Sequence, residues 1–137
     1  MHDRQHIADL PRILHQKGVH FVIISPGSRN ALIINAFIKE FGNQCISIVD
    51  ERSAAYVGLG IASYTKIPVV LICTSGTAAL NYAPALAEAY YLGLPVIAVT
   101  ADRPPEWIGQ QDNQAGKQDS SPRMRIHAVT FRSGRAT

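Results

Sequence analysis

The sequence lacks several features that mark membrane and secreted proteins. Among its 137 residues, no uninterrupted apolar run approaches the roughly 18 residues that a membrane-spanning helix needs. The N-terminal residues Met1–His6 lead into a polar helix and lack the apolar centre of a signal peptide. Only two cysteines are present, Cys45 and Cys73, and both lie in apolar, strand-like runs. We therefore expect free buried thiols in a reducing compartment, and hence a cytoplasmic protein without a membrane span.

Charged residues are also scarce, and they are unevenly distributed. They make up 17% of the chain against 47% hydrophobic residues, and this composition excludes a disordered protein. A length of 137 residues is enough for one domain with a core. Residues 1–116 carry eight Lys and Arg against nine Asp and Glu, whereas residues 117–137 carry five against one. The net charge of +3 therefore comes from the tail. Its basic residues do not alternate with aromatic ones as a stacking platform requires, so we expect a solvated, irregular tail that binds no nucleic acid.

Helix-like and strand-like segments alternate along the chain. Mostly apolar strands are expected at 21–24, 45–49, 67–73 and 94–99, and helices at 4–17, after residue 29 for about three turns, at 51–64 and at 74–91. Pro84 either kinks the last helix or marks its true first turn. Strands that are apolar on both faces and separated by helices predict an open parallel α/β sheet with helices on both faces.

Polar clusters follow all four expected strands. Right-handed crossovers bring the carboxyl ends of such strands to one edge of the sheet, which is where ligands bind in open α/β folds. We therefore expect a site at this edge. Glu51 is its most informative residue, because it stands where the strand 45–49 gives way to a helix. The four clusters are Ser25–Arg29, Asp50–Arg52, Thr74–Thr77 and Thr100–Arg103.

Each cluster has a structural interpretation beside the functional one. Ser25–Arg29 can cradle a phosphate or carboxylate, with close backbone approach at Gly27, Ser28 capping the next helix and Arg29 binding the anion. It can also be a Pro-Gly turn with Ser28 as the helix cap and no ligand. Thr74–Thr77 can be a helix N-terminus that aims free backbone amides at a ligand, or Ser75 or Thr77 can simply cap the helix. Arg103 can bind an anion or form a structural ion pair with a neighbouring carboxylate. The histidines and cysteines do not form a metal-ligand set.

Taken together and in order, these motifs closely resemble the start of the 2-succinyl-5-enolpyruvyl-6-hydroxy-3-cyclohexene-1-carboxylate synthase family of menaquinone biosynthesis. The resemblance spans residues 10–115, and each motif alone is weakly specific. The residues that carry it are Ile24–Arg29, Val49–Ala55, Cys73–Ala79, Glu88–Tyr91, Thr100–Glu106 and Asn113-Gln114.

The resemblance implies a transferase that uses thiamine diphosphate and Mg²⁺, decarboxylates 2-oxoglutarate and adds the remaining succinyl unit to isochorismate. The fold would be the pyrimidine-binding (Pyr) domain. Glu51 would be catalytic by hydrogen bonding to N1′ of the cofactor's pyrimidine, and Gln114 would contact reaction intermediates. The cofactor would also contact Thr74, Ser75 and Gly76, and Ser28, Arg29 and Arg103 would bind substrate carboxylates.

The same resemblance implies that much of the enzyme lies outside this chain. The family's diphosphate- and Mg²⁺-binding domain is absent from the sequence, so we expect no metal ligands here and an inactive isolated chain. The family is expected to form homodimers or homotetramers with sites shared between subunits. Residues 1–115 would form the N-terminal part of the Pyr domain, and residues 116–137 a basic, irregular tail that departs from the family pattern through truncation, a frameshift or a natural difference.

Two other functions remain open at this stage. A related thiamine-diphosphate lyase or carboligase would share Glu51 but lack the Asp-Glu-Arg-Ser and Thr-Ala-Asp-Arg-Pro sequences. A non-catalytic α/β module would bind a nucleotide at the same edge, and its function would survive mutation of Glu51.

Overall fold

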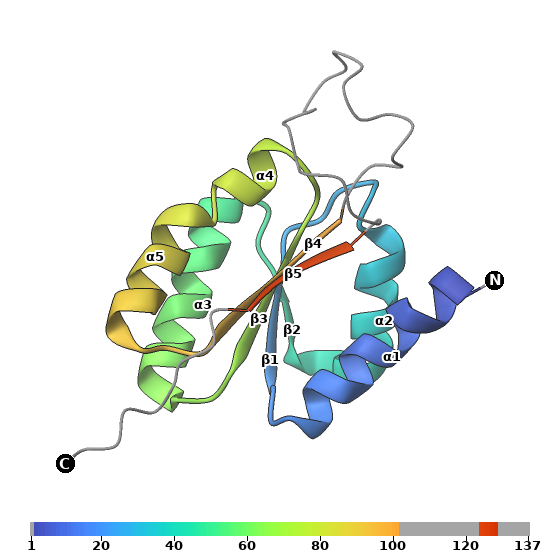
Figure 1. Cartoon of the computed structure of the whole chain (residues 1–137), viewed down its shortest axis with the longest axis horizontal. Helices are drawn as coiled ribbons and strands as arrows, with labels where there is room; N and C mark the ends of the chain where they lie inside the picture. The colour runs from blue at the N-terminus through green and yellow to red at the C-terminus, as the bar shows by residue number, and fades with distance from the viewer. Residues whose placement is uncertain (1, 102–123, 129–137) are drawn as a thin grey trace.

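The computed structural model in Figure 1 describes residues 2–101 and 124–128, with side chains from residue 6 to residue 101. Helices and strands alternate through most of this range. The elements are α1 (His2–Gln16), β1 (Phe21–Ile24), α2 (Ala31–Phe41), the 3₁₀ turn η1 (Gly42–Gln44), β2 (Cys45–Ser47), α3 (Glu51–Thr65), β3 (Val69–Cys73), α4 (Thr77–Leu80), α5 (Ala83–Leu92), β4 (Val96–Ala101) and β5 (Met124–Ala128).

The strands form one sheet in the order β2-β1-β3-β4-β5. Neighbouring pairs among the first four strands are parallel, which confirms the predicted parallel α/β fold. β5 is antiparallel to β4, with Thr100 opposite Arg125. The tail 116–137, expected to be irregular, therefore contains a strand at Met124–Ala128. Apolar and polar residues alternate in this segment, a pattern typical of strands, and β4 offers a free edge for it. The domain boundary at residue 115 lies outside the described residues.

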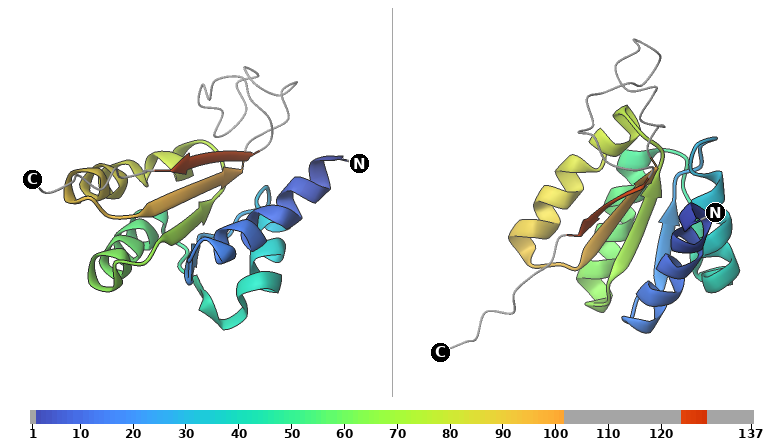
Figure 2. Two further views of the ribbon diagram at one scale, coloured as in Figure 1. Left: turned by 60° about the horizontal axis from the view of Figure 1, so that its bottom comes forward. Right: turned by 45° about the vertical axis from the view of Figure 1, so that its right-hand side comes forward.

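Helices cover the sheet on both faces, as predicted (Figure 2). On one face, α1 and α2 pack against a cluster that includes Val22, Val70 and Val99. On the other, α3, α4 and α5 pack against a cluster that includes Ile23 and Leu71. Adjacent strand residues alternate between these clusters, because successive side chains point to opposite faces of a sheet. No helix in the described part of the chain is long and apolar enough to cross a membrane.

β2 departs from the expected buried strand at 45–49. It ends at Ser47 and its residues are only partly covered, while Val49 beyond it is 76% exposed. The reason is its position, since β2 forms one edge of the sheet and has a single neighbour, β1. Cys45 is accordingly half-buried, whereas Cys73 in the central strand β3 is fully buried, and both are free thiols as expected.

The helix expected at 74–91 is in fact two helices. α4 covers only Thr77–Leu80, and α5 begins at Ala83 with Pro84 in its first turn. Pro84 therefore marks a helix start, the second of the two predicted alternatives. Proline is favoured there because the first turn of a helix has no use for its missing amide hydrogen.

The strand order sets the position of a ligand site. The connection from β1 leads to α2 on one face of the sheet, and the connection from β3 leads to α4 on the other. β1 and β3 are neighbours, so the connections diverge between them. Such a switch point is where open α/β sheets bind ligands, at the carboxyl ends of the strands. The loops at this point carry Ser25–Arg29 and Thr74–Gly76.

Candidate functional site at the carboxyl edge of the sheet

The loop after β1 is tied to two neighbouring strands at its first residue. The backbone nitrogen of Ser25 donates to the carbonyl of Ile72, 2.8 Å away, and its hydroxyl donates to the carbonyl of Ile48 at 2.9 Å. Ser25 is 1% exposed. These two hydrogen bonds fix the start of the loop to β3 on one side and to the segment after β2 on the other.

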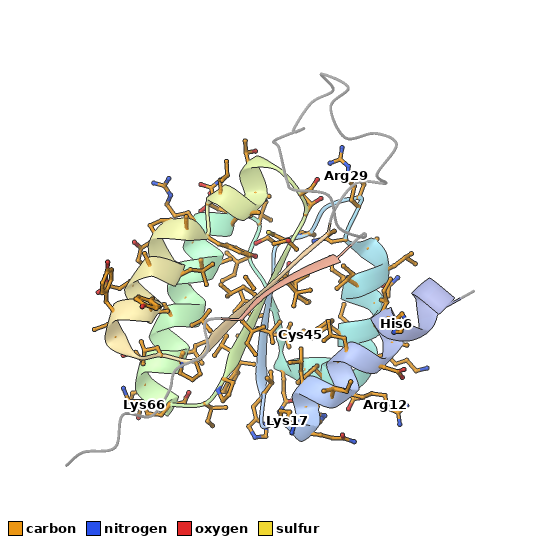
Figure 3. All side chains as sticks on the ribbon, in the orientation of Figure 1. His6, Arg12, Lys17, Arg29, Cys45 and Lys66 are labelled. Atoms are coloured by element: carbon orange, nitrogen blue, oxygen red, sulfur yellow. The ribbon has the colours of Figure 1, made fainter. Side chains whose placement is uncertain are left out.

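Ser28 does not cap the following helix, although both interpretations of this loop gave it that role. α2 begins at Ala31, and its N-cap residue is Asn30, whose side chain makes no capping hydrogen bond. Ser28 and Arg29 are exposed at the tip of the loop. In Figure 3 the Arg29 side chain points away from the sheet at the end of the molecule opposite Lys17 and Lys66. The tip is therefore exposed on the side where the strands end, which leaves the anion-binding interpretation open.

Glu51 is the first residue of α3, as predicted, at the carboxyl end of the β2 segment. The adjacent Asp50 caps this helix, since its Oδ1 accepts a hydrogen bond of 2.7 Å from the Ser53 nitrogen. That hydrogen bond holds the pKa of Asp50 below its usual range. Because Asp50 satisfies the helix end, the Glu51 carboxylate is not used for capping. Within the described residues it makes no hydrogen bond or ion pair.

The loop after β3 does not cap a helix with its side chains either. The N-cap residue of α4 is Gly76, with φ of 73° and no side-chain capping bond. Thr74 Oγ1 and Ser75 Oγ are buried, and neither has a hydrogen-bond partner among the residues that the structure describes. The same is true of Thr100 Oγ1 at the end of β4. Buried hydroxyls normally find partners, so three that find none among the described residues, at the ends of β3 and β4, leave hydrogen-bonding capacity for a group outside those residues.

A further buried hydroxyl lies beneath the same edge. Tyr82 is fully buried near Ser25 and Cys73, and its Oη makes no well-formed hydrogen bond among the described residues. Ser25 donates to Ile48, and Cys73 Sγ lies 3.3 Å from the Thr74 carbonyl. Burial raises the pKa of the Cys73 thiol to about 12 and that of Tyr82 well above its usual range, and the charge of Glu51 adds to both shifts. Both groups are therefore neutral at physiological pH.

The structure thus brings together part of the predicted site. Ser28, Arg29, Glu51 and the Thr74–Gly76 loop follow three neighbouring strands at one edge. Arg103 and Gln114 lie outside the described residues. No group of three or more His, Cys, Asp and Glu side chains that could hold a metal was found in the described part. Sequence reasoning missed Tyr82, for which the sequence gives no signal, and Asn30, whose position directly after Arg29 could have drawn attention to it.

A family model described as the thiamine pyrophosphate enzyme, N-terminal TPP binding domain, matches residues 6–121. Curated relatives named 2-succinyl-5-enolpyruvyl-6-hydroxy-3-cyclohexene-1-carboxylate synthase are similar over most of the chain. The protein of Desulfotalea psychrophila is 53% identical over 120 residues, covering 88% of this chain and 22% of the relative. That of Cytophaga hutchinsonii is 53% identical over 114 residues, covering 83% and 20%.

A third relative from Porphyromonas gingivalis, with the same name, is 45% identical over 119 residues, covering 87% of this chain and 21% of its own length. The chain therefore spans about a fifth of the length of the curated relatives it matches. The family match covers most of the chain, including every predicted site residue. The chain belongs to the thiamine pyrophosphate enzyme family and corresponds to the N-terminal TPP-binding domain of these enzymes.

Proposed function

We propose that this chain is the N-terminal part of a thiamine-diphosphate-dependent synthase of menaquinone biosynthesis, which joins decarboxylated 2-oxoglutarate to isochorismate. The observation that carries the proposal is the 53% identity over 120 residues to a synthase of that name. The proposed enzyme is a transferase. Because the chain spans about a fifth of such relatives, the isolated chain is proposed to be inactive.

The residues at the carboxyl edge fit a thiamine diphosphate (thiamine pyrophosphate) cofactor. A pyrimidine ring needs hydrogen-bond partners, and the edge offers the Glu51 carboxylate together with the buried, unpartnered hydroxyls of Thr74 and Ser75. When bound, the cofactor supplies the nucleophilic carbon and the electron sink for decarboxylation of a 2-oxo acid. Glu51 is proposed to share a proton with N1′ of the ring, and Thr74, Ser75 and Gly76 to line the ring.

The substrates proposed for this enzyme are carboxylate anions, and the loop after β1 suits them. Arg29 can bind a carboxylate through two parallel hydrogen bonds, and the exposed Ser28 hydroxyl stands next to it. Arg103 is proposed to bind a second carboxylate, and Gln114 to hydrogen-bond the reacting species. In this scheme the chain positions the substrates and the proton at N1′.

Binding of the cofactor's diphosphate is assigned to another part of the protein. The described residues contain no acidic or histidine cluster able to hold a divalent cation. We propose that Mg²⁺ and the diphosphate are held by a domain outside this chain, with no metal ligand among residues 1–137. Because the diphosphate and Mg²⁺ would be bound outside this chain, the isolated chain should bind the cofactor poorly.

We also propose that the protein is a cytoplasmic homo-oligomer. Helices α3 and α5 lie together on one face of the sheet and expose large apolar side chains to solvent. Exposed apolar surface of this kind is typical of protein interfaces. The side chains concerned are Tyr56, Val57, Tyr64, Tyr90, Tyr91 and Leu92.

The experiment that tests the function uses the complete protein that carries this domain. The purified protein, with thiamine diphosphate and Mg²⁺, should release CO₂ from 2-oxoglutarate and consume isochorismate with it in equal amounts. Pyruvate offered in place of 2-oxoglutarate should give little product, since it lacks the distal carboxylate. Preference for pyruvate would assign the domain to another carboligase. The 137-residue chain alone should show no turnover.

The cofactor assignment has its own test on the short chain. Calorimetric titration of the 137-residue protein with thiamine diphosphate and Mg²⁺ should show weak binding or none. A dissociation constant in the low-micromolar range or tighter would contradict the assignment of the diphosphate site to another domain.

A further inference from the structure

Asn30 is a fully buried polar residue that the proposed chemistry does not use. It stands at the N-cap position of α2, where asparagine is favoured for capping, yet its side chain makes no capping bond. Its exposed fraction is 0%, while the two residues before it, Ser28 and Arg29, are exposed. Because buried polar groups are normally hydrogen-bonded, a buried carboxamide that does not cap the helix is expected to bond other partners.

The Asn30 carboxamide faces back into the loop and bonds at both of its ends. Its Oδ1 accepts a hydrogen bond of 2.8 Å from the Gly27 nitrogen, and its Nδ2 donates one of 2.9 Å to the Ser25 carbonyl. The first bond closes a ring around the two residues that lie between Gly27 and Asn30. Those residues are Ser28 and Arg29, the proposed substrate contacts.

The rest of the loop is held just as closely against the sheet. Ser25 is bonded to the carbonyls of Ile72 and Ile48. A Cβ atom on Gly27 would lie 3.1 Å from the Cβ of Thr74, so the backbone at Gly27 packs tightly on the loop after β3. The loop therefore has a fixed base, and Asn30 is the side chain that ties its exposed tip to that base.

We propose that Asn30 is a positioning residue which holds the Ser28–Arg29 tip in the conformation that receives a substrate carboxylate. The inference rests on the proposed function of this tip. Fixing the backbone on both sides of Arg29 lowers the conformational entropy that the loop would otherwise lose when a carboxylate binds. Asn30 is too deeply buried to touch the substrate, so its whole effect passes through the tip.

The test is a double-mutant cycle in the complete enzyme, with KM and kcat measured for both acidic substrates. Asn30→Ala removes both hydrogen bonds, and Asn30→Asp keeps an acceptor for the Gly27 nitrogen but loses the donor to Ser25. Each should raise the KM of one acidic substrate about tenfold with a smaller change in kcat, as expected for lost binding. Asn43→Ala, in the exposed turn η1, is the matched control and should leave both constants unchanged.

Coupling to Arg29 separates positioning from general destabilisation. In an Arg29→Ala background, Asn30→Ala should raise KM by less than about twofold, because the group that it positions is gone. An Asn30 effect that is equal in the two backgrounds would overturn the proposal, as would unchanged KM in both Asn30 variants. If Arg29→Ala alone changes neither KM, the proposed role of the tip fails first, and the role of Asn30 falls with it.

A direct measurement of the two Asn30 hydrogen bonds covers the case in which Asn30→Ala folds poorly. In Asn30→Ser, whose shorter side chain suits the N-cap position but cannot span both hydrogen bonds, amide hydrogen exchange at Gly27 should be faster than in the wild type, while exchange in β3 stays unchanged. Equal exchange at Gly27 would show that Asn30 does not hold the loop.

Discussion

A Cβ atom placed on Gly58 would lie 2.5 Å from Cδ2 of Leu71, closer than real side chains approach. Gly58 is one of the buried residues of α3, and Leu71 is in the middle of β3. The absence of a side chain at Gly58 lets α3 come close to the strand. That close approach fixes the position of the whole helix, and so of Glu51 at its start.

Gly58→Ala should therefore destabilise the protein. The added methyl group forces α3 or Leu71 to move, at a cost of about 1–3 kcal/mol in the free energy of unfolding, from which helix propensity returns up to about 1 kcal/mol. Gly60→Ala in the same helix is the control. A Cβ at Gly60 meets nothing within 4 Å, so this variant should be about 0.5–1 kcal/mol more stable than wild type. Urea unfolding of the wild type and the two variants measures these differences in the free energy of unfolding. Equal stabilities for the two variants would contradict the tight α3–β3 packing.

The fold could be predicted largely from the sequence because its signals are local. The apolar run at β3 and the proline at the start of α5 act through neighbouring residues, and both were recognised. Exposure of Val49 could not be predicted, because it depends on β2 being at the sheet edge. Register and strand order are tertiary properties that a single apolar run does not encode.

Prediction of the site had the same limit: features set by local sequence could be predicted, and features set by tertiary structure could not. Placement of Glu51 at a strand-to-helix junction follows from local sequence, and the structure has it there. The capping roles considered for Ser28, and for Ser75 or Thr77, were wrong, because Asn30 and Gly76 occupy the N-cap positions. Whether a serine caps or faces a ligand depends on where the first helical turn begins, which sequence patterns locate only to within a few residues.

The protein should lose stability in alkaline solution through two buried groups. The Cys73 thiol has its pKa raised from 9.0 to about 12 in the folded state, so only the unfolded chain releases its proton between these values. Stability from this group is complete below about pH 9 and falls by about 1.4 kcal/mol per pH unit up to about pH 12. Tyr82 acts in the same direction, since burial also raises its pKa.

Urea unfolding at several pH values tests this prediction. Cys73→Ala and Tyr82→Phe should each make the alkaline loss of stability shallower, and the double variant should flatten it further. Tyr82→Phe should cost little at neutral pH, because its hydroxyl has no hydrogen-bond partner to lose. A double variant with the same alkaline slope as wild type would show that other groups cause the loss.

The two proposed anion-binding arginines should govern substrate affinity. In the complete enzyme, Arg29→Ala and Arg103→Ala should each raise the KM for an acidic substrate about 10- to 100-fold, since a charge-assisted contact is present in the ground state as well as the transition state. Lys66→Ala, at the end of the molecule opposite Arg29 (Figure 3), is a charge-matched control that should leave KM unchanged. A fall in kcat with unchanged KM would exclude a simple binding role for the arginine concerned.

The central claim, that Glu51 handles the proton at the cofactor's pyrimidine, is tested most directly by Glu51→Gln in the complete enzyme. Glutamine preserves the shape of the side chain and can still hydrogen-bond, but it cannot share a proton with N1′. Turnover should fall by about 10²- to 10⁴-fold, while calorimetry shows that thiamine diphosphate still binds. Near-normal turnover in the Glu51→Gln enzyme, with cofactor bound, would contradict the account.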